Sequence, residues 1–594
     1  MYCRLQRALL TVQQLYSHAS GVANLLGKEL AEHSCHAHSL QLLPRATTAV
    51  TTFLILFKIP DWHMHPGSNL CFLSSRDLPL LRDAAAVNAS FNTLPKEANG
   101  FPANKTLQDF LAANFGAAGS DFESAVPEDF YAEPDNFLPN VTDPAIRKWA
   151  LQVNGLWQDL CREVNESVMQ QPQLHSLLPL PGITAVPGDR FRELYYWDSF
   201  WVIKGLLVSG MTETATSEVT NLLSLQETYG HVPNGARVYY INRSQPPMLS
   251  NMVRAVYEAT QDDSFLAYAL PLLISEHNYW TVEPKQVTVS TDSGSYKLSR
   301  FYADWFAPRP ESYLEDFQSA QGMSGSQQQQ LWHDLASGAE SGMDFSSRWF
   351  GNPDNISTIQ TTRIIPAELN AYLYQMESNI AELADGMGNS TLAASFRDFA
   401  AARKAAINTL MYNDTAGRWF DLIIDDTTRS PVAAVQNNNT ISYVSQYIPL
   451  WVGIADEGSS QAAAVTRSFF ESGLIQAGGI STSTYNSSQQ WDFPNCWAPL
   501  QDIMVEALMM YGGEEGQREA EKIVQIWLNS NYLGYQETGF MVEKYDAVTP
   551  GIPGAGGEYA VQSGFGWTNG VMLSFLNTFG WNPEAANMTT AVAA

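Results

Sequence analysis

The sequence is short of positive charge. Its 594 residues include 33 Lys and Arg against 61 Asp and Glu, which gives a formal net charge of −28. A surface of that sign repels nucleic-acid phosphates and anionic lipid headgroups, so we expect neither as a partner. A neutral small molecule fits this charge balance better.

Cysteine is scarce as well. The five cysteines are an odd number and none belongs to a CxxC pair, which argues against both a disulfide framework and a structural zinc site. The histidine-rich stretch at residues 33–38 has no second ligand cluster, and no HExxH motif is present. The sequence therefore predicts no metal site. The five are Cys3, Cys35, Cys71, Cys161 and Cys496.

Long apolar runs are missing too. The most apolar stretch, Ala46–Phe57, has 12 residues, whereas a spanning helix needs about 20. It would suit the apolar part of a signal peptide, but it lies too far inside the chain, and the first 30 residues contain no such part. No apolar tail follows at residues 581–594, which disfavours a lipid anchor.

Helical periodicity dominates what is present. In residues 366–386, apolar residues recur at spacings of three and four, with Pro at the start and Gly at the end. The stretch 324–330, rich in Ser and Gln, reads as an exposed loop, and 417–426 is the best candidate strand. We expect paired helices joined by long loops. Further helices are expected near residues 146–170, 194–209, 212–228, 250–279, 391–411, 460–473, 500–511, 515–529 and 566–578.

N-glycosylation acceptors are frequent. Eleven N-x-S/T triplets are present, which favours a secretory route and a secreted, extracellular or vacuolar destination, although no signal peptide is recognisable. They begin at Asn88, Asn104, Asn140, Asn165, Asn242, Asn355, Asn389, Asn413, Asn438, Asn486 and Asn587.

The loops concentrate Trp, Arg, Asn, Gly and carboxylates, while phosphate-binding and GxSxG motifs are absent. Planar Arg and carboxylate groups can bond neighbouring sugar hydroxyls, and Trp can cover the apolar face of a sugar ring. Cleavage of a glycosidic bond needs one protonated carboxyl and one ionised carboxylate. The residues alone do not choose between the candidates, which are Asp198, Glu311, Asp344, Asp492, Glu543 and Glu558.

Two long motifs in these loops narrow the choice. "PGDRFRELYYWDSF" (187–200) resembles the first signature of the trehalases, PGGRFxExYxWDxY, and "QWDFPNCWAPLQ" (490–501) resembles the second, QWDxPxGWxPxQ. Five further segments follow the order of that family: "VPNGARVYYINRSQPP", "PRPESY", "AESGMDFSSRWF", "VEKYD" and "GGEYAVQSGFGWTNGV".

The resemblance implies an all-α (α/α)6 toroid that hydrolyses α,α-trehalose to two glucose molecules with inversion and without a metal or cofactor. It makes Asp344 the general acid and Glu543 the general base, which must then meet across 199 residues of chain (543 − 344). It also implies a substrate-binding set of Arg190, Trp197, Asp198, Asn234, Arg243, Ser244, Gln245, Arg309, Glu311, Gly342 and Glu558. Asn242 adjoins Arg243 in this set, so we expect Asn242 to carry no glycan.

Some positions depart from the family pattern. Asp189 stands where the signature has Gly, and Met343 replaces the Trp that usually precedes the acid. Met343 could alter the wall of the pocket, which keeps two alternatives open: a hydrolase of another α-glucoside, and a catalytically impaired sugar-binding protein. The presence of both Asp344 and Glu543 argues against the second alternative.

The resemblance also divides the chain. Tyr2–Leu15 resembles the opening helix of the family and Ser74–Leu80 the segment that should follow it almost at once, but the residues between them have no counterpart. We interpret residues 1–74 as an atypical segment, disordered, inserted or wrongly deduced from the gene. Residues 75–580 are the expected catalytic domain, and 581–594 a short tail.

Overall fold

The computed structural model describes residues 77–97, 102–188, 191–292, 294–424, 431–433, 440–558, 561–582 and 584. The interpretation of residues 1–74 therefore falls outside the described part.

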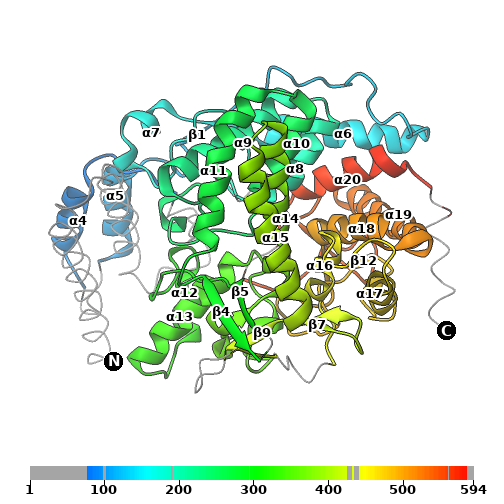
Figure 1. The fold of residues 1–594 in the computed structure, drawn as a ribbon. Coiled ribbons are helices and arrows are strands. Elements are labelled where there is room, and N and C mark those ends of the chain that lie inside the picture. Colours follow the sequence, from blue (N-terminus) through cyan, green and yellow to red (C-terminus); the bar gives the residue numbers. More distant parts are fainter. Residues whose placement is uncertain are drawn as a thin grey trace.

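Six helices in the described part form a closed inner ring, in which each contacts the next and the last contacts the first. They are α8 (Asp198–Val208), α10 (Leu249–Thr260), α14 (Ala367–Gly386), α16 (Ile448–Trp451), α18 (Ala498–Tyr511) and α20 (Gly566–Phe579). Six more helices pack outside this ring: α6 (Pro144–Leu160), α9 (Thr212–Tyr229), α11 (Asp263–Trp280), α15 (Ser390–Leu410), α17 (Ser460–Phe470) and α19 (Gly513–Thr538). The predicted (α/α)6 toroid is confirmed, and Figure 1 shows α14 beside α15 and α18 beside α19.

The remaining elements lie between and around these helices. The other helices are α4 (Ala84–Asn92), α5 (Asn104–Asn114), α7 (Glu166–Gln170), α12 (Tyr313–Ser319) and α13 (Gly325–Glu340). The antiparallel strand groups are β1 (Phe122–Ser124), β2 (Cys161–Val164) and β3 (Thr184–Ala185); β4 (Gln286–Thr291) and β5 (Gly294–Ser299); β6 (Ile364–Ile365), β9 (Leu422–Ile424) and β10 (Pro431–Ala433); β7 (Tyr412–Asn413) and β8 (Arg418–Trp419); β11 (Ile475–Gln476) and β12 (Gly479–Ile480); β13 (Asn495–Trp497) and β14 (Lys544–Asp546).

Local chemistry explains where the expected elements were wrong. The helix expected at 250–279 is two helices, because Gln261 takes a φ of 53° and Asp262 caps the second helix through its carboxylate. The helix expected at 146–170 ends at Leu160 and gives way to β2 and α7. The stretch 324–330 is not a loop. It opens α13, with the Ser324 amide donating to Gln327 Oε1 at 3.0 Å, and Gln favours helices.

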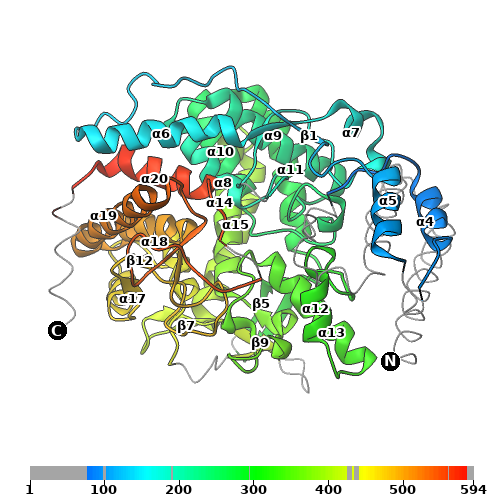
Figure 2. The same cartoon turned by 180° about the vertical axis from the view of Figure 1, so that it is seen from behind.

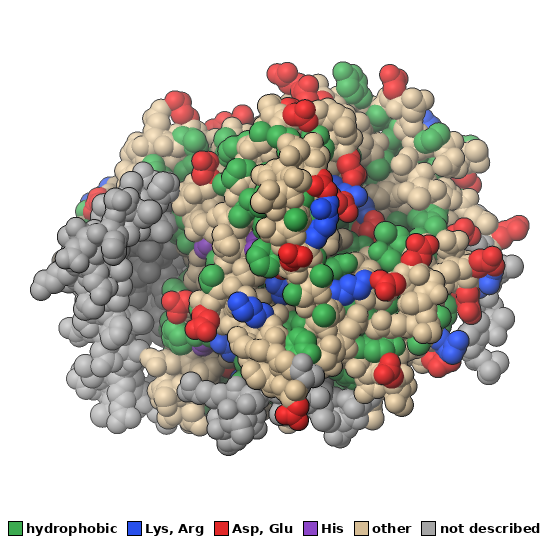
Figure 3. All heavy atoms as spheres, in the orientation of Figure 1, with side chains coloured by type: hydrophobic (Ala, Val, Ile, Leu, Met, Phe, Trp, Pro, Cys, Tyr) green, Lys and Arg blue, Asp and Glu red, His purple; other side chains and the backbone are tan. Residues whose placement is uncertain are grey.

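A second, smaller apolar cluster lies at one edge of the molecule. It is formed by α4, α5 and neighbouring residues, including Leu80, Val87, Phe91 and Leu107. Figures 1 and 2 place these two helices at the opposite edge from α19. On the face in Figure 3, acidic side chains are scattered widely, in keeping with the net charge. Among the described helices, none has both the length and the apolar character that crossing a bilayer requires.

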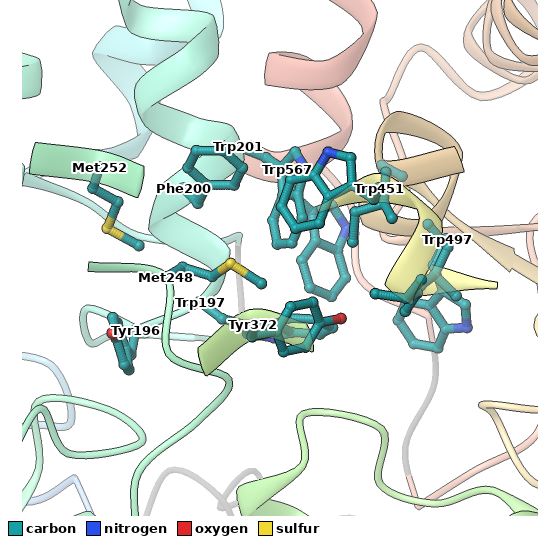
Figure 4. Packing of buried hydrophobic residues seen from close by; sticks show 14 of the residues in the cluster. Tyr196, Trp197, Phe200, Trp201, Met248, Met252, Tyr372, Trp451, Trp497 and Trp567 are labelled. Atoms are coloured by element: carbon teal, nitrogen blue, oxygen red, sulfur yellow. The ribbon is translucent and has the colours of Figure 1, made fainter. Parts of the chain in front are cut away.

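The ring closes where α8 and α20 meet with almost no space between their backbones. A Cβ added at Gly570 would lie 1.9 Å from the Trp201 carbonyl oxygen, and one at Gly205 would lie 2.5 Å from the Gly570 Cα. Only residues without a side chain permit this approach. Indoles pack beside the contact, and the ring centroids of Trp197 and Trp201 are 5.4 Å apart. Figure 4 labels Phe200, Trp201 and Trp567 in this part of the core.

We expect Gly570→Ala to lower the free energy of unfolding by about 3 kcal/mol, because the added methyl group would meet backbone that has no room to move. Gly155→Ala in α6 is the matched control. Its added Cβ would meet nothing within 4 Å, so helix propensity should raise stability by about 0.5–1 kcal/mol. Denaturant unfolding of both variants checks this, and equal midpoints would contradict it.

Candidate active site

A cavity lies at the amino-terminal ends of three inner helices. Trp197, Trp497 and Phe565 directly precede α8, α18 and α20 and all line it. The cavity and the open solvent at its mouth together enclose about 720 Å³ of space. Loops that precede the helices therefore supply the site, and the helices hold those loops in place.

Eleven of the predicted site residues line this one cavity, although they come from distant parts of the chain. They are Trp197, Asp198, Asn234, Arg243, Gln245, Arg309, Glu311, Gly342, Asp344, Glu543 and Glu558.

Ser244 does not line the cavity. Its hydroxyl donates to the Val232 carbonyl at 2.6 Å, and its amide donates to Glu340 Oε1 at 2.9 Å, so both groups hold the loop. The predicted part of Ser244 in substrate binding stays a prediction, and its bonded groups hold the loop that carries Arg243 and Gln245. Arg190 lies outside the described residues, as does Asp189.

Asp344 follows the end of α13 and is held through its backbone. Gly342 turns the chain with a φ of 69°, and a Cβ there would lie 2.8 Å from the Trp197 ring. The Trp349 indole donates to the Met343 carbonyl at 3.1 Å, and Gln490 Nε2 donates to the Asp344 carbonyl at 2.6 Å. The carboxyl group is consequently aimed by bonds that leave its own oxygens available.

Burial raises the pKa of Asp344 to about 7, with the Arg309 charge opposing and the Glu558 charge adding to the effect. A carboxyl group with such a pKa keeps its proton over a useful range near neutrality. It can therefore serve as a general acid.

Glu543 lines the same cavity and comes from a part of the chain far from Asp344. It precedes β14, which pairs with β13 so that Lys544 lies opposite Trp497. The Glu543 amide donates to the Gln562 carbonyl at 2.9 Å, and the Trp567 indole donates to the Glu543 carbonyl at 2.9 Å. The side chain is 2% exposed. Residues of α20 and its preceding loop thus fix the backbone that carries the second carboxylate.

The second signature also holds the segment that carries the acid. The Trp491 amide donates to the Phe345 carbonyl at 3.0 Å, and the carboxylate of Asp492 accepts from Ser346 Oγ at 3.0 Å and from the Ser347 amide at 2.7 Å. Asp492 is fully buried in these bonds and is not among the described residues that line the cavity. Among the candidate carboxylates, Asp492 therefore holds the loop together and does not face the cavity.

Two arginines in the cavity are paired with acids. Arg309 Nη2 donates to Asp316 Oδ1 at 2.7 Å and to Glu558 Oε1 at 2.8 Å, while Arg243 pairs with Glu311. These bonds fix both guanidinium planes before any ligand arrives.

Asp198 is a third carboxyl group close to the acid and the base. Burial raises its pKa to about 8, and the charges of Glu543 and Asp344 contribute in the same direction. Near neutral pH it is a hydrogen-bond donor as well as an acceptor.

Aromatic residues form walls that sequence reasoning did not single out. Trp491 stacks on Trp497 with ring centroids 3.9 Å apart, and Trp497 meets Trp567 edge-on at 5.6 Å. All three lie inside the quoted motifs, and the concentration of Trp in these loops favoured a sugar site. Buried aromatic residues are ordinary in any core, so the residue type did not show which indoles form the wall. The other lining residues that were not predicted are Pro187, Phe191, Tyr195, Tyr240, Ser312, Gln490 and Phe565.

Met343 lies behind the acid. It is 1% exposed, its sulfur is 3.8 Å from Arg348 Nη1, and it is not among the described residues that line the cavity. Met343 therefore packs in the core next to Asp344, outside the described lining of the cavity.

The described residues contain no group of three or more His, Cys, Asp or Glu side chains arranged to hold a metal ion. The histidine-rich stretch at 33–38 lies outside the described part of the chain.

Comparison with known proteins agrees with this geometry. The model of the family described as trehalase matches residues 74–580. The chain belongs to the trehalase family. A probable trehalase of Oryza sativa subsp. japonica is 45% identical over 517 residues, covering 85% of this chain and 91% of the rice protein. The trehalase of Arabidopsis thaliana is 41% identical, covering 90% of this chain and 87% of that protein.

More distant trehalases match as well. The human trehalase is 38% identical over 85% of each chain. Among solved structures, the neutral trehalase Nth1 from Saccharomyces cerevisiae shares the fold with a TM-score of 0.58 at 22% identity, over 75% of this chain and 96% of the yeast chain.

We expect Asp344→Asn to stabilise the protein at pH 8 and to leave its stability unchanged at pH 4. The folded protein holds this proton more tightly than the unfolded chain, so the wild type loses stability as pH rises from about 4 to 7 and the carboxyl group ionises. The gain at pH 8 should be on the order of 2 kcal/mol. Asp398→Asn, at an exposed site in α15, should show no such dependence. Unfolding at both pH values checks this; a loss of stability at pH 8 would contradict it.

Proposed function

We propose that this chain hydrolyses α,α-trehalose to two glucose molecules, with inversion at one anomeric carbon. The observation that carries the proposal is the meeting of Asp344 and Glu543 in one cavity, the first with a pKa raised to about 7. Membership of the trehalase family supports the choice of substrate.

In this proposal Asp344 is the general acid. Its proton passes to the oxygen between the two glucose units as the bond from that oxygen to one anomeric carbon breaks. The departing glucose then carries a neutral hydroxyl group. Positive charge that develops on the other sugar ring is stabilised by the neighbouring carboxylates.

Glu543 is the general base. It takes a proton from a water molecule that attacks the anomeric carbon on the face opposite the departing oxygen. One glucose is thus released as the β-anomer and the other as the α-anomer. This geometry requires the two carboxyl groups to stand roughly 6.5–9.5 Å apart, so that the water fits between the base and the sugar.

The remaining cavity residues suit a neutral, hydroxyl-rich ligand. Arg243 and Arg309 are held by acids and present rigid donors, and Asp198 can donate or accept. The indoles of Trp197 and Trp497 offer apolar surface to the C–H face of a sugar ring. The position of Met343 behind the acid removes the main reason to favour a different α-glucoside or a binding role.

Asp344→Asn and Glu543→Gln should each lower kcat by about 10³-fold with little change in KM, since proton transfer by a positioned group contributes about 10²–10⁴. Proton NMR of the wild-type reaction, read before mutarotation, should give equal early amounts of α- and β-glucose. Two α-glucoses would mean retention and would overturn these roles. Absence of turnover by folded wild-type protein would overturn the activity.

We also propose that the protein is a secreted glycoprotein, with the vacuole as the alternative destination. Support comes from the sequons, because the side chains at Asn104, Asn140, Asn355, Asn389, Asn413 and Asn486 are exposed. Asn242 differs from them, since its Nδ2 is buried beside Arg243.

Glycopeptide mapping of the protein from its natural source should find glycans at several of the exposed sequons and none at Asn242, because its amide nitrogen is inaccessible in the folded chain. An unglycosylated protein would contradict the proposed route. A glycan at Asn242 would contradict the position of its loop.

A further inference from the structure

The Gln490 side chain joins the segment that carries the acid to the strand that follows the base. Its Nε2 donates to the Asp344 carbonyl at 2.6 Å, and its Oε1 accepts from Lys544 Nζ at 2.9 Å. Gln490 is 3% exposed, so water competes little for either bond. A single amide thus spans the two sides of the site.

The ammonium group of Lys544 decides which way this amide faces. An ammonium can only donate, so the amide oxygen of Gln490 must point to Lys544 and its NH2 group to the Asp344 carbonyl. If the amide were flipped, its NH2 group would face the Lys544 ammonium and its oxygen would face the Asp344 carbonyl, and neither pair can form a hydrogen bond. Without Lys544, the amide loses the partner that fixes its orientation.

Lys544 is buried at a cost that strand formation alone does not require. It is 0% exposed, and its other contacts are the Gly556 carbonyl at 3.2 Å and the face of Trp497 at 5.0 Å. Burial lowers its pKa to about 8, while the charges of Glu543 and Asp344 raise it. Burying an ammonium group with neutral hydrogen-bond partners costs free energy, whereas an apolar side chain could occupy the same strand position without that cost.

Two glycines leave the space that this arrangement needs. A Cβ at Gly557 would lie 2.6 Å from Gln490 Oε1, and a Cβ at Gly554 would lie 2.9 Å from Lys544 Cγ. The Gly554 amide also donates to the Lys544 carbonyl at 2.9 Å. The loop after β14 is therefore shaped around both side chains.

We propose that Lys544 is a positioning residue that holds the acid-bearing and base-bearing segments at a fixed separation through the Gln490 amide. The inference rests on the hydrolysis proposed above. Lys544 directly follows Glu543 and pairs with Trp497, so it moves with the base. It is not among the described residues that line the cavity. Its hydrogen bond to Gln490 sets the position of the Asp344 backbone, whereas its charge acts on both carboxyl groups directly and remains in Gln490→Met.

The test compares Lys544→Met, Gln490→Met and the double variant by kcat, KM and thermal midpoint. Lys544→Met should lower kcat by 10- to 100-fold with KM changed less than about 3-fold, because misplacement of the acid by about 1 Å costs up to 10² in rate. The double variant should lower kcat little further than Lys544→Met alone, since both changes break one bridge. Its thermal midpoint should exceed that of Gln490→Met alone, because the double variant no longer buries the Lys544 ammonium against an apolar side chain.

Measuring both stability and kcat therefore distinguishes a positioning role from a purely structural role of the bridge. If kcat of the double variant recovers together with its thermal midpoint, the bridge is only structural and the proposal is overturned. The control Lys404→Met, which loses bonds to the Gly453 carbonyl and Asp456 far along the chain in α15, should keep the wild-type kcat.

A second variant covers the case in which Lys544→Met does not fold. Gln490→Glu keeps an acceptor for Lys544 but has no donor for the Asp344 carbonyl, so kcat should fall by about 10-fold; an unchanged kcat would overturn the proposal. Wild-type protein without activity on trehalose would instead overturn the proposed function. Active wild type with a fully active Lys544→Met variant would overturn only the positioning role.

Discussion

The contact between α8 and α20 is the constraint on which the rest of the molecule depends. Gly205 and Gly570 let the two backbones touch, and this contact joins the first inner helix to the last. Asp198 begins α8 and Trp567 lies in the first turn of α20, so closing the ring brings opposite ends of the domain to one cavity. The positions of the acid and the base both follow from that closure, through Trp197 against Gly342 and through Trp567 against Glu543.

Burial acts differently on carboxyl groups that the fold brings close together. The carboxylate oxygens of Asp492 accept hydrogen bonds from Ser346 and Ser347, and these bonds anchor the chain just after Asp344. Asp344 is anchored by its backbone instead, and its carboxyl group is left with a raised pKa. In the same buried environment, one carboxyl group thus anchors the chain and the other has a raised pKa, according to where the hydrogen bonds fall.

Sequence patterns predicted much of this structure. Periodicity located most helices, and the motifs located most residues that line the cavity. The resemblance implied a closed ring, but the glycine contact that closes it could not be predicted, because the approach of Gly205 to Gly570 depends on packing across 365 residues of chain (570 − 205). The bond from the Ser244 hydroxyl to the Val232 carbonyl could not be predicted, because a motif identifies a residue and not the direction of its side chain. Gln490 and Lys544 were overlooked since their importance lies in a bond between two motifs.

The order of the elements along the chain also governs when the cavity can exist. During synthesis α8 emerges long before α20. The face of α8 around Trp201 and Gly205 therefore stays uncovered until α20, more than 300 residues later in the chain, has been made. Until residues 565–579 have left the ribosome, the cavity lacks the wall of Phe565 and Trp567. The ring and its cavity are thus completed only at a late stage of synthesis, and a nascent chain that lacks α20 cannot form the complete site.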